Sequence, residues 1–116
     1  MITNRKTKKD MLQDENMENI AKSRKIKNNT LKIWYKNGDI AIKLHYTNII
    51  IYKNNGDIIL NSGGWKSVTT KSRMTEFSPF YIHQKNHVWY VTTDKGIYNY
   101  YDGIIFDSQG NLKKWK

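Results

Sequence analysis

The sequence predicts an α+β protein with a mostly antiparallel sheet of about six to eight short strands, one short inserted helix, and a basic N-terminal arm that is partly helical. Three observations carry this prediction. Runs of β-branched and aromatic residues recur from residue 30 onward, and 13% of the chain is aromatic. Turn sequences rich in Asn, Asp and Gly separate these runs. Within the compact part, only Asn61–Phe77 has the composition of a loop that leads into a helix.

Residues 1–29 form the predicted N-terminal arm, and residues 30–116 form one compact β-rich domain. Within the arm, Lys9–Lys25 is predicted to be helical, because its acidic residues come early and its basic residues late, which complements a helix dipole. Two interpretations of the first eight residues stay open: they grip a phosphate backbone or a partner, or they are a solvated terminus. The predicted helix is also a candidate surface for a homodimer.

Four strands are predicted between residues 30 and 60. Asn37-Gly38 follows the first of them and is the strongest short signal for a hairpin with a type I′ turn, in which both central residues have positive φ. The next strand alternates apolar and polar residues, which is typical of a strand with one solvated face. The four strands are Leu31–Lys36, Ile40–Thr47, Ile49–Lys53 and Ile58–Leu60.

The inserted helix is predicted over about Lys71–Phe77, with Thr69 or Thr70 as its N-cap and Pro79 as its stop. After the helix, a hairpin around Asn86-His87 and two further short strands are expected. These strands are Phe80–Lys85, Val88–Thr93, Ile97–Tyr101 and Ile104–Phe106, and Leu112–Lys116 is a basic tail that contains Trp115.

The corner Ser62-Gly63-Gly64 breaks the strand that precedes the helix, because glycine permits φ values that other residues avoid. A strand, a Gly-rich loop and a helix start in this order can form an anion site, since free N–H groups and the helix dipole point at the loop. Three interpretations stay open: a structural corner with Trp65 plugging the core, a contact with phosphate or nucleic acid, and a protein-binding epitope.

The chain has a formal net charge of +10 over 116 residues. A field of this size favours polyanions such as nucleic acid, a nucleoprotein or an acidic protein face. The alternative, a surface lysine excess that merely reflects an AT-rich gene, stays open. The absence of cysteine excludes disulfides and thiolate metal sites and fits an intracellular protein. No apolar run is long enough to cross a membrane, so we expect no membrane partner.

No residue pattern predicts catalysis, and we expect a protein that is not an enzyme, with no catalytic residue and no cofactor. Most Asp residues lie beside glycines in turns, where Asp bonds the local backbone, and this leaves little for a paired-carboxylate mechanism. His83 and His87 have a spacing that suits a metal only on a helix, but they flank a predicted hairpin turn, so no metal site is expected.

Aromatic residues and lysines alternate along the predicted strands. Half of the aromatic side chains are expected to face the core. The others lie next to Lys36, Lys43, Lys53 and Lys95 and would form a basic face that stacks bases while the lysines hold phosphates. Cross-strand packing of tyrosines on a twisted sheet explains the same pattern equally well.

The stretch GDIILNSGGWKSVTTKSRM at Gly56–Met74, followed by HQKNHVWYV and YYDGI, resembles a family of small proteins encoded by bacteriophages and prophages. In that family a strand leads into a Gly-Gly-Trp corner, a Thr-Thr-Lys-x-Arg-Met helix start, a tryptophan-bearing strand and a Tyr-Asp-Gly ending. The resemblance covers Ile40–Ile105 and leaves the N-terminal arm outside. It implies a place in the host cytoplasm and a role against host defence: blocking a CRISPR effector, shielding DNA or sequestering a signalling nucleotide.

The leading hypothesis is a non-enzymatic phage protein that engages nucleic acid, or a host nucleoprotein complex such as a CRISPR effector, through a basic surface. The second is a nucleotide-binding sponge, in which the Gly-rich loop holds phosphates and Trp65 or Trp89 stacks a base. The third is a virion or assembly component. The predicted contacts are Lys66, Thr69, Thr70, Lys71 and Arg73, with Lys22, Arg24, Lys25 and Lys27 as a second contact.

Overall fold

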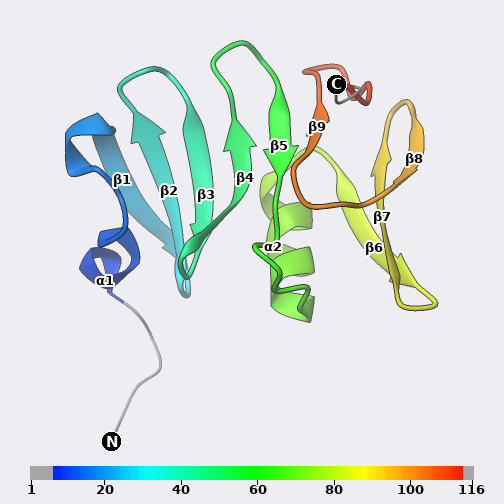
Figure 1. The fold of residues 1–116 in the computed structure, drawn as a ribbon, viewed down its shortest axis with the longest axis horizontal. Helices are drawn as coiled ribbons and strands as arrows, with labels where there is room; N and C mark the ends of the chain where they lie inside the picture. The colour runs from blue at the N-terminus through cyan, green and yellow to red at the C-terminus, as the bar shows by residue number, and fades with distance from the viewer. Residues whose placement is uncertain (1–6, 114–116) are drawn as a thin grey trace, which may run out of the picture.

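Two antiparallel sheets and the helix between them make up the computed structural model, which describes residues 7–113 (Figure 1). The large sheet has the strand order β1-β2-β3-β4-β5-β9, and the small sheet has the order β6-β7-β8. The strands are β1 (Ile20–Lys27), β2 (Thr30–Tyr35), β3 (Ile40–Leu44), β4 (Thr47–Tyr52), β5 (Ile58–Leu60), β6 (Tyr81–Lys85), β7 (Val88–Thr93), β8 (Gly96–Asn99) and β9 (Ile104–Phe106). The helices are α1 (Lys8–Leu12), the short 3₁₀ turn η1 (Met17–Asn19) and α2 (Val68–Phe77).

The chain leaves the large sheet after β5, forms α2 and the small sheet, and returns to pair β9 with β5. The predicted α+β class with a mostly antiparallel sheet and one inserted helix is therefore confirmed. Residues 7–113 contain nine strands in two sheets, against about six to eight expected for the chain. The added strand is β1, and the division into two sheets has no signature in the local sequence pattern.

One face of the large sheet, which we call the helix face, packs against α2 and the small sheet. Ile42, Ile50, Leu60 and Ile104 are successive cross-strand partners on this face, and each is at most 3% exposed. Met74 of α2 and Val91 of β7 lie in the same buried cluster, so the two sheets share one core. Sheet faces that pack against other elements are expected to bury such apolar rows.

The opposite face of the large sheet, which we call the arm face, is covered at one end by α1. Leu31 and Ile33 of β2 point to this face and form a second buried cluster with Met11 and Leu12 of α1. The capping box of Thr7 and Asp10, each of which bonds the backbone N–H of the other, fixes the start of α1. The N-terminal segment is therefore docked onto the sheet from Lys8 onward.

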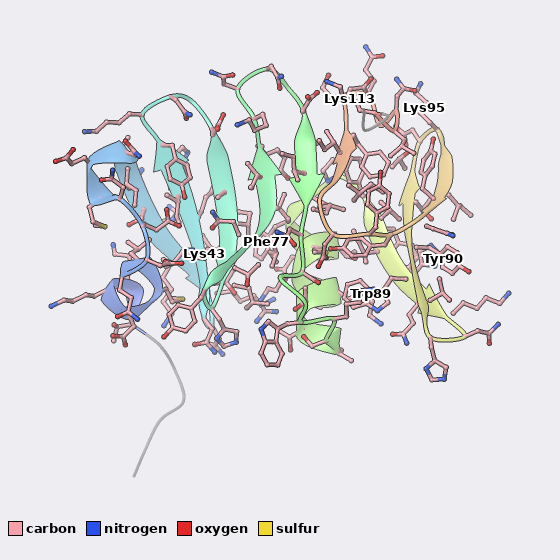
Figure 2. All side chains as sticks on the ribbon, viewed as in Figure 1. Lys43, Phe77, Trp89, Tyr90, Lys95 and Lys113 are labelled. Carbon is pink, nitrogen blue, oxygen red and sulfur yellow. The ribbon has the colours of Figure 1, made fainter. Side chains whose placement is uncertain are left out.

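A buried lysine lies beneath the segment that follows α1. Lys43 is 2% exposed, and its Nζ lies 2.9 Å from Glu15 Oε2 and 3.6 Å from Asp14 Oδ1 (Figure 2). A buried ammonium group requires such partners, because desolvation of an unpaired charge costs several kcal/mol. The acidic middle of the arm is consequently a counter-charge for β3, and Lys43 is absent from the solvent-exposed basic surface.

The predicted helix over Lys9–Lys25 is wrong beyond Leu12. The helix ends at Leu12, and Ile20–Lys27 is an edge strand that pairs with β2. Two register shifts in this strand let Ile20 pack against the arm-face cluster while Ile26 packs against the helix-face core. Tertiary packing therefore overrides the helical charge order, because the free edge of β2 offers hydrogen bonds and burial that an isolated helix lacks.

The predicted type I′ turn at Asn37-Gly38 is also wrong, since only Gly38 has a positive φ. The side chain of Asn37 accepts the N–H of Asp39 at 2.9 Å, an arrangement that requires no positive φ at Asn37. The hairpin with two positive φ values is the one at Asn86 and His87, with φ of 52° and 67°. It joins β6 to β7, as expected from the sequence.

The inserted helix begins three residues earlier than predicted and ends where predicted. Ser67 is the N-cap in place of Thr69 or Thr70, and its Oγ accepts the N–H of Thr70 at 3.1 Å. Several hydroxyl residues precede the helix, so the sequence offers more than one capping candidate. Pro79 follows the last helical residue, Phe77, by two positions.

Candidate functional site

The turns at the two ends of the strands differ in their acidic residues. At the upper edge in Figure 1, the turns β2–β3, β4–β5 and β7–β8 and the segment after β9 carry Asp39, Asp57, Asp94 and Asp107. At the lower edge, the turns β1–β2, β3–β4 and β6–β7 and the segment that leads into α2 carry no acidic residue. Each acidic segment at the upper edge also carries a lysine, and Asp102 lies in the corner at the lower edge, so the contrast concerns the acidic turns and not the net charge.

The Gly-rich corner at the lower edge is organised around the carboxylate of Asp102. The N–H and the hydroxyl of Ser62 each donate to Asp102 Oδ1 at 2.8 Å, and the N–H of Gly64 donates to Oδ2 at 3.3 Å. The hydroxyl of Tyr100 donates to Oδ1 at 2.5 Å. These donors come from two segments that are about forty residues apart in the chain, and the carboxylate joins them.

The protonation of this cluster follows from the same contacts. Burial by itself raises the pKa of Asp102, but the hydrogen bonds from Tyr100, Ser62 and Gly64 outweigh burial and hold that pKa below its usual range. Burial, followed by the hydrogen bond and the negative charge of Asp102, raises the pKa of the Tyr100 hydroxyl. Asp102 is thus ionised and Tyr100 neutral near pH 7.

The predicted anion site at the corner consequently holds an anion of the protein itself. The N–H of Gly63 is also satisfied, by the side-chain oxygen of Asn61 at 3.0 Å. A phosphate that entered the corner would have to displace Asp102 from its hydrogen bonds. The backbone N–H groups of the corner are therefore already hydrogen-bonded within the protein. A ligand would instead bind the side chains that surround the corner.

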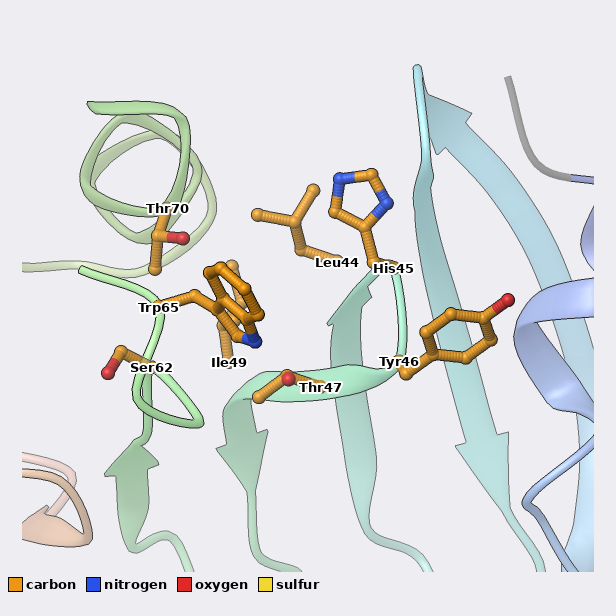
Figure 3. A pocket seen from close by; sticks show the side chains of 8 residues that line it. All are labelled: Leu44, His45, Tyr46, Thr47, Ile49, Ser62, Trp65 and Thr70. Atoms are coloured by element: carbon orange, nitrogen blue, oxygen red, sulfur yellow. The ribbon is translucent and has the colours of Figure 1, made fainter. Parts of the chain in front are cut away.

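A pocket of about 330 Å³ lies beside the corner (Figure 3). Its lining residues are Leu44, His45, Tyr46, Thr47, Ile49, Ser62, Trp65 and Thr70, none of which is acidic. Leu44 and Ile49 give the pocket an apolar floor, Trp65 stands at its side, and the hydroxyl of Ser62 is turned away from the indole toward Asp102 (Figure 3). Small-ligand sites have this character, an apolar body with a few polar groups, and begin at about this volume.

Trp65 is 75% exposed, so the interpretation that its ring plugs the core is wrong. Positive φ at Gly63 and Gly64, 64° and 88°, turns the chain so that the ring faces out. The added Cβ of any other residue at position 63 would lie 2.6 Å from Thr47 Oγ1. The corner therefore brings Trp65 to the surface at the pocket rim.

The five residues predicted to form the first contact lie on different sides of α2. Thr69 is exposed, whereas Thr70 is 2% exposed and bonds Ser67 Oγ at 3.0 Å. Lys66 Nζ lies 5.8 Å from the ring centroid of Tyr100, and Lys71 Nζ bonds Gln84 at 2.8 Å. Arg73 turns toward the other side and donates to Thr30 Oγ1 at 3.1 Å. Lys66 thus lies toward Tyr100, Lys71 toward Gln84 and Trp89, and Arg73 toward β2, so the five residues do not form one cluster.

The second predicted contact is divided by the strand geometry of β1. Lys22 and Arg24 pair with Trp34 and Lys32 of β2 on the helix face. Lys25 pairs with Leu31, whose side chain belongs to the arm face. The remaining cation, Lys27, forms an ion pair with Glu76 of α2 at 2.8 Å.

Trp89, the other predicted stacking residue, is 5% exposed and lies in the shared core (Figure 2). Its ring contacts Tyr100 at a centroid distance of 5.4 Å, so no face of it is open to a base. The histidines on either side of the β6–β7 turn do not converge: His83 bonds Thr92 and stacks on Tyr81, and His87 lies in the turn. Within residues 7–113, no group of three or more acidic or histidine side chains is placed to hold a metal ion.

Sequence reasoning missed the residues of the pocket that lie outside the corner. His45 and Tyr46 form the β3–β4 turn, and His45 has a positive φ of 55°, which no local pattern indicates. From the sequence, Asp102 is interpreted as a turn residue because Gly103 follows it. In the structure its carboxylate accepts hydrogen bonds from the corner at Ser62, which is distant in the chain. The Tyr-x-Asp-Gly spacing is the one local signal in this segment, and by itself it names no partner.

A family model described as Kyanoviridae Gp96 protein matches residues 5–109. No curated protein and no solved structure matches the chain at a significant level. Among the described residues, no helix has the length and apolar character that crossing a membrane requires.

Proposed function

Because the chain belongs to the Kyanoviridae Gp96 protein family, a family of small phage-encoded proteins, we propose that it is a non-enzymatic binding protein that engages nucleic acid, either free or within a nucleoprotein complex of the host. The contact is the lower edge of the molecule. The observation that carries the proposal is Trp65, 75% exposed at the rim of a pocket without acidic lining residues and next to Lys66.

The chemistry of the pocket suits an unstacked base. A base stacks on an exposed aromatic ring, the apolar floor accepts its other side, and the hydroxyl group of Thr47 meets its polar edge. Lys66, the chain neighbour of Trp65, is the cation proposed to hold a flanking phosphate. Such a contact is independent of sequence unless the hydroxyl group discriminates between base edges.

In the phage context this contact would act in the host cytoplasm against a host defence. In the simplest form of this role, the protein would occupy the surface of an effector, such as a CRISPR complex, that faces nucleic acid. This form requires no catalytic group. A pull-down from host lysate with and without nuclease separates the cases. A defined nucleoprotein retained after digestion supports an effector partner, and bulk nucleic acid lost on digestion supports direct binding.

Fluorescence anisotropy with a labelled single-stranded oligonucleotide tests the contact itself. Trp65→Ala is expected to weaken binding by about 1–3 kcal/mol, the usual worth of one base stacked on an aromatic ring. The matched control is Ile97→Ala, since Ile97 is 65% exposed on β8, away from the corner. Equal affinities of the two variants, or binding that is insensitive to salt, would contradict the proposal.

A second candidate is a sponge for a signalling nucleotide, favoured by the volume of the pocket, about 330 Å³, which suits one small ligand better than a strand. A panel of mononucleotides and cyclic nucleotides in a thermal-shift assay tests it, because a ligand that binds only the folded state raises the melting temperature. A shift that Trp65→Ala abolishes would move this candidate ahead of strand binding.

A further inference from the structure

The helix face of β1–β3 carries a groove that neither α2 nor the small sheet covers. Its volume is about 440 Å³, and it is lined by Arg24, Ile26, Lys32, Ile40, Ile42, Tyr52 and Phe77. Phe77 is the last residue of α2, and its carbonyl accepts the hydroxyl of Tyr52, so the end of the helix closes one side of the groove. The other side is the outer edge of β1.

The cations of this face surround an aromatic ring. Lys22 Nζ and Lys32 Nζ lie 5.0 and 4.9 Å from the ring centroid of Trp34, which is half-buried. Lys22 and Trp34 are direct cross-strand partners. The ring is therefore in contact with two ammonium groups that a phosphate can reach. A base that stacks on the ring in place of one lysine would leave that lysine near the phosphate of the same nucleotide.

The placement of Arg24 opposes the stability of the sheet. Arg24 and Lys32 are direct cross-strand partners, and like charges in that position are destabilising. No acidic residue lines the groove, and Glu76 of α2 is already paired with Lys27 at 2.8 Å. A bound polyanion would supply the missing counter-charge, whereas the fold alone gains nothing from this pair.

The apolar floor decides which polyanion fits. In a duplex the base faces are stacked on each other, so only backbone phosphates would meet the groove, and the aromatic and isoleucine side chains would stay solvated. In a single strand the faces of the bases are free to cover Trp34 and the groove floor. An acidic protein segment matches the charge but lacks planar groups for the ring.

We propose that this face, centred on Arg24, Lys32 and Trp34, is a second binding surface for single-stranded nucleic acid. It deepens the function proposed above and rests on it: the strand that places a base at Trp65 would continue across the helix face of β1–β3. The affinity would then come from two separate surfaces of one domain, and losing either would weaken binding.

The variant Lys32→Glu distinguishes a binding role of Lys32 from a merely structural one. The variant places opposite charges across β1 and β2, so its melting temperature should equal or exceed that of the unchanged protein. Its affinity for a single-stranded oligonucleotide should fall at least about tenfold at low salt, and the slope of log K against log salt should become shallower by about 0.7 or more. The control is Lys36→Glu, which changes the net charge of +10 by the same amount at the exposed β2–β3 turn.

Equal losses of affinity in Lys32→Glu and Lys36→Glu would overturn the inference. Binding of a duplex as tightly as a single strand, or displacement of the strand by polyglutamate at equal charge, would overturn it as well. If Trp65→Ala weakens binding while Lys32→Glu and Arg24→Gln do not, the second surface is disproved and the function stands. If the unchanged protein binds no nucleic acid, the function itself is disproved. Arg24→Gln covers the case in which Lys32→Glu fails to fold.

Discussion

Among single residues, Asp102 has the largest role in shaping the candidate site. Its carboxylate accepts hydrogen bonds from Ser62, Gly64 and Tyr100, so it fills a corner that would otherwise expose free N–H groups. An external anion is therefore not needed to satisfy the corner. What the corner offers to a ligand is the ring of Trp65, held at the surface by a turn that Asp102 stabilises.

Replacing Asp102 with Asn removes the charge and turns one acceptor into a donor. We expect a loss of about 1–2 kcal/mol in the free energy of unfolding at pH 7, a modest value because water reaches this exposed residue. Urea unfolding measures it, with Asp94→Asn as the control in another turn. A neutral effect of Asp102→Asn would show that the corner holds itself together without the carboxylate.

The contribution of Asp102 should also depend on pH. Its pKa in the folded state lies below the value of about 3.9 expected in the unfolded chain, so its stabilisation is complete above that pH. The stabilisation is lost as the pH falls through the folded pKa. The difference in stability between the unchanged protein and Asp102→Asn should therefore shrink below about pH 4. A difference that is constant between pH 7 and pH 3 would contradict this assignment.

The two glycines of the corner should differ in their tolerance of a side chain. Both have positive φ, but a Cβ at Gly63 would lie 2.6 Å from Thr47 Oγ1 and 2.8 Å from Cγ2, whereas a Cβ at Gly64 meets nothing within 4 Å. Gly64→Ala should cost about 1 kcal/mol for backbone strain alone, and Gly63→Ala clearly more. Thermal unfolding compares them, and Thr47→Ala should rescue Gly63→Ala in part. Equal costs without rescue would rule out the close contact.

Among the elements, β1 and α2 determine where the cations lie. As a strand, β1 sends Lys22 and Arg24 to the helix face and Lys25 to the opposite face, whereas a helix would have grouped them differently. Around the start of α2, Lys66 lies over the ring of Tyr100 and Lys71 over the ring of Trp89. The two proposed surfaces are therefore products of element geometry, since the residues of each come from separate strands and loops.

The N-cap of α2 should be worth a measurable part of the stability. Ser67→Ala removes the acceptor for the N–H of Thr70 and the hydrogen bond to Thr70 Oγ1, and we expect a loss of about 1 kcal/mol. Ser72→Ala, at an exposed position in the interior of the same helix, should be neutral or slightly stabilising. Chemical denaturation distinguishes the two. A larger loss for Ser72→Ala would mean that the helix starts elsewhere.

Across the whole molecule, the two sheets are joined by one core, and most of the acidic turns lie at one edge of the strands. Ile82 and Val91 of the small sheet lie in the same cluster as Ile42 and Ile50 of the large sheet. A core that is shared in this way is expected to unfold as a unit. The rigid scaffold then carries the acidic turns at one edge and the corner with its exposed tryptophan at the other (Figure 1).

Unfolding should accordingly be a single cooperative transition. Far-UV and near-UV circular dichroism should give the same midpoint, and Ile82→Val should shift both midpoints together, with a cost of about 0.5–1.5 kcal/mol. The physical reason is that Ile82 belongs to the small sheet but is buried in the common core. Two separated transitions would show that the small sheet unfolds independently.

The strands from Thr30 onward, the inserted helix and its end before Pro79 follow from local patterns, because alternation, turn residues and proline act over a few residues. The net charge and the phage-family resemblance are likewise properties of the chain. Tertiary structure alone decided that Ile20–Lys27 is an edge strand, that Trp65 faces solvent while Trp89 is buried, and that Asp102 fills the corner. Each of these depends on contacts between segments far apart in the chain, where burial and hydrogen bonding outweigh local preference.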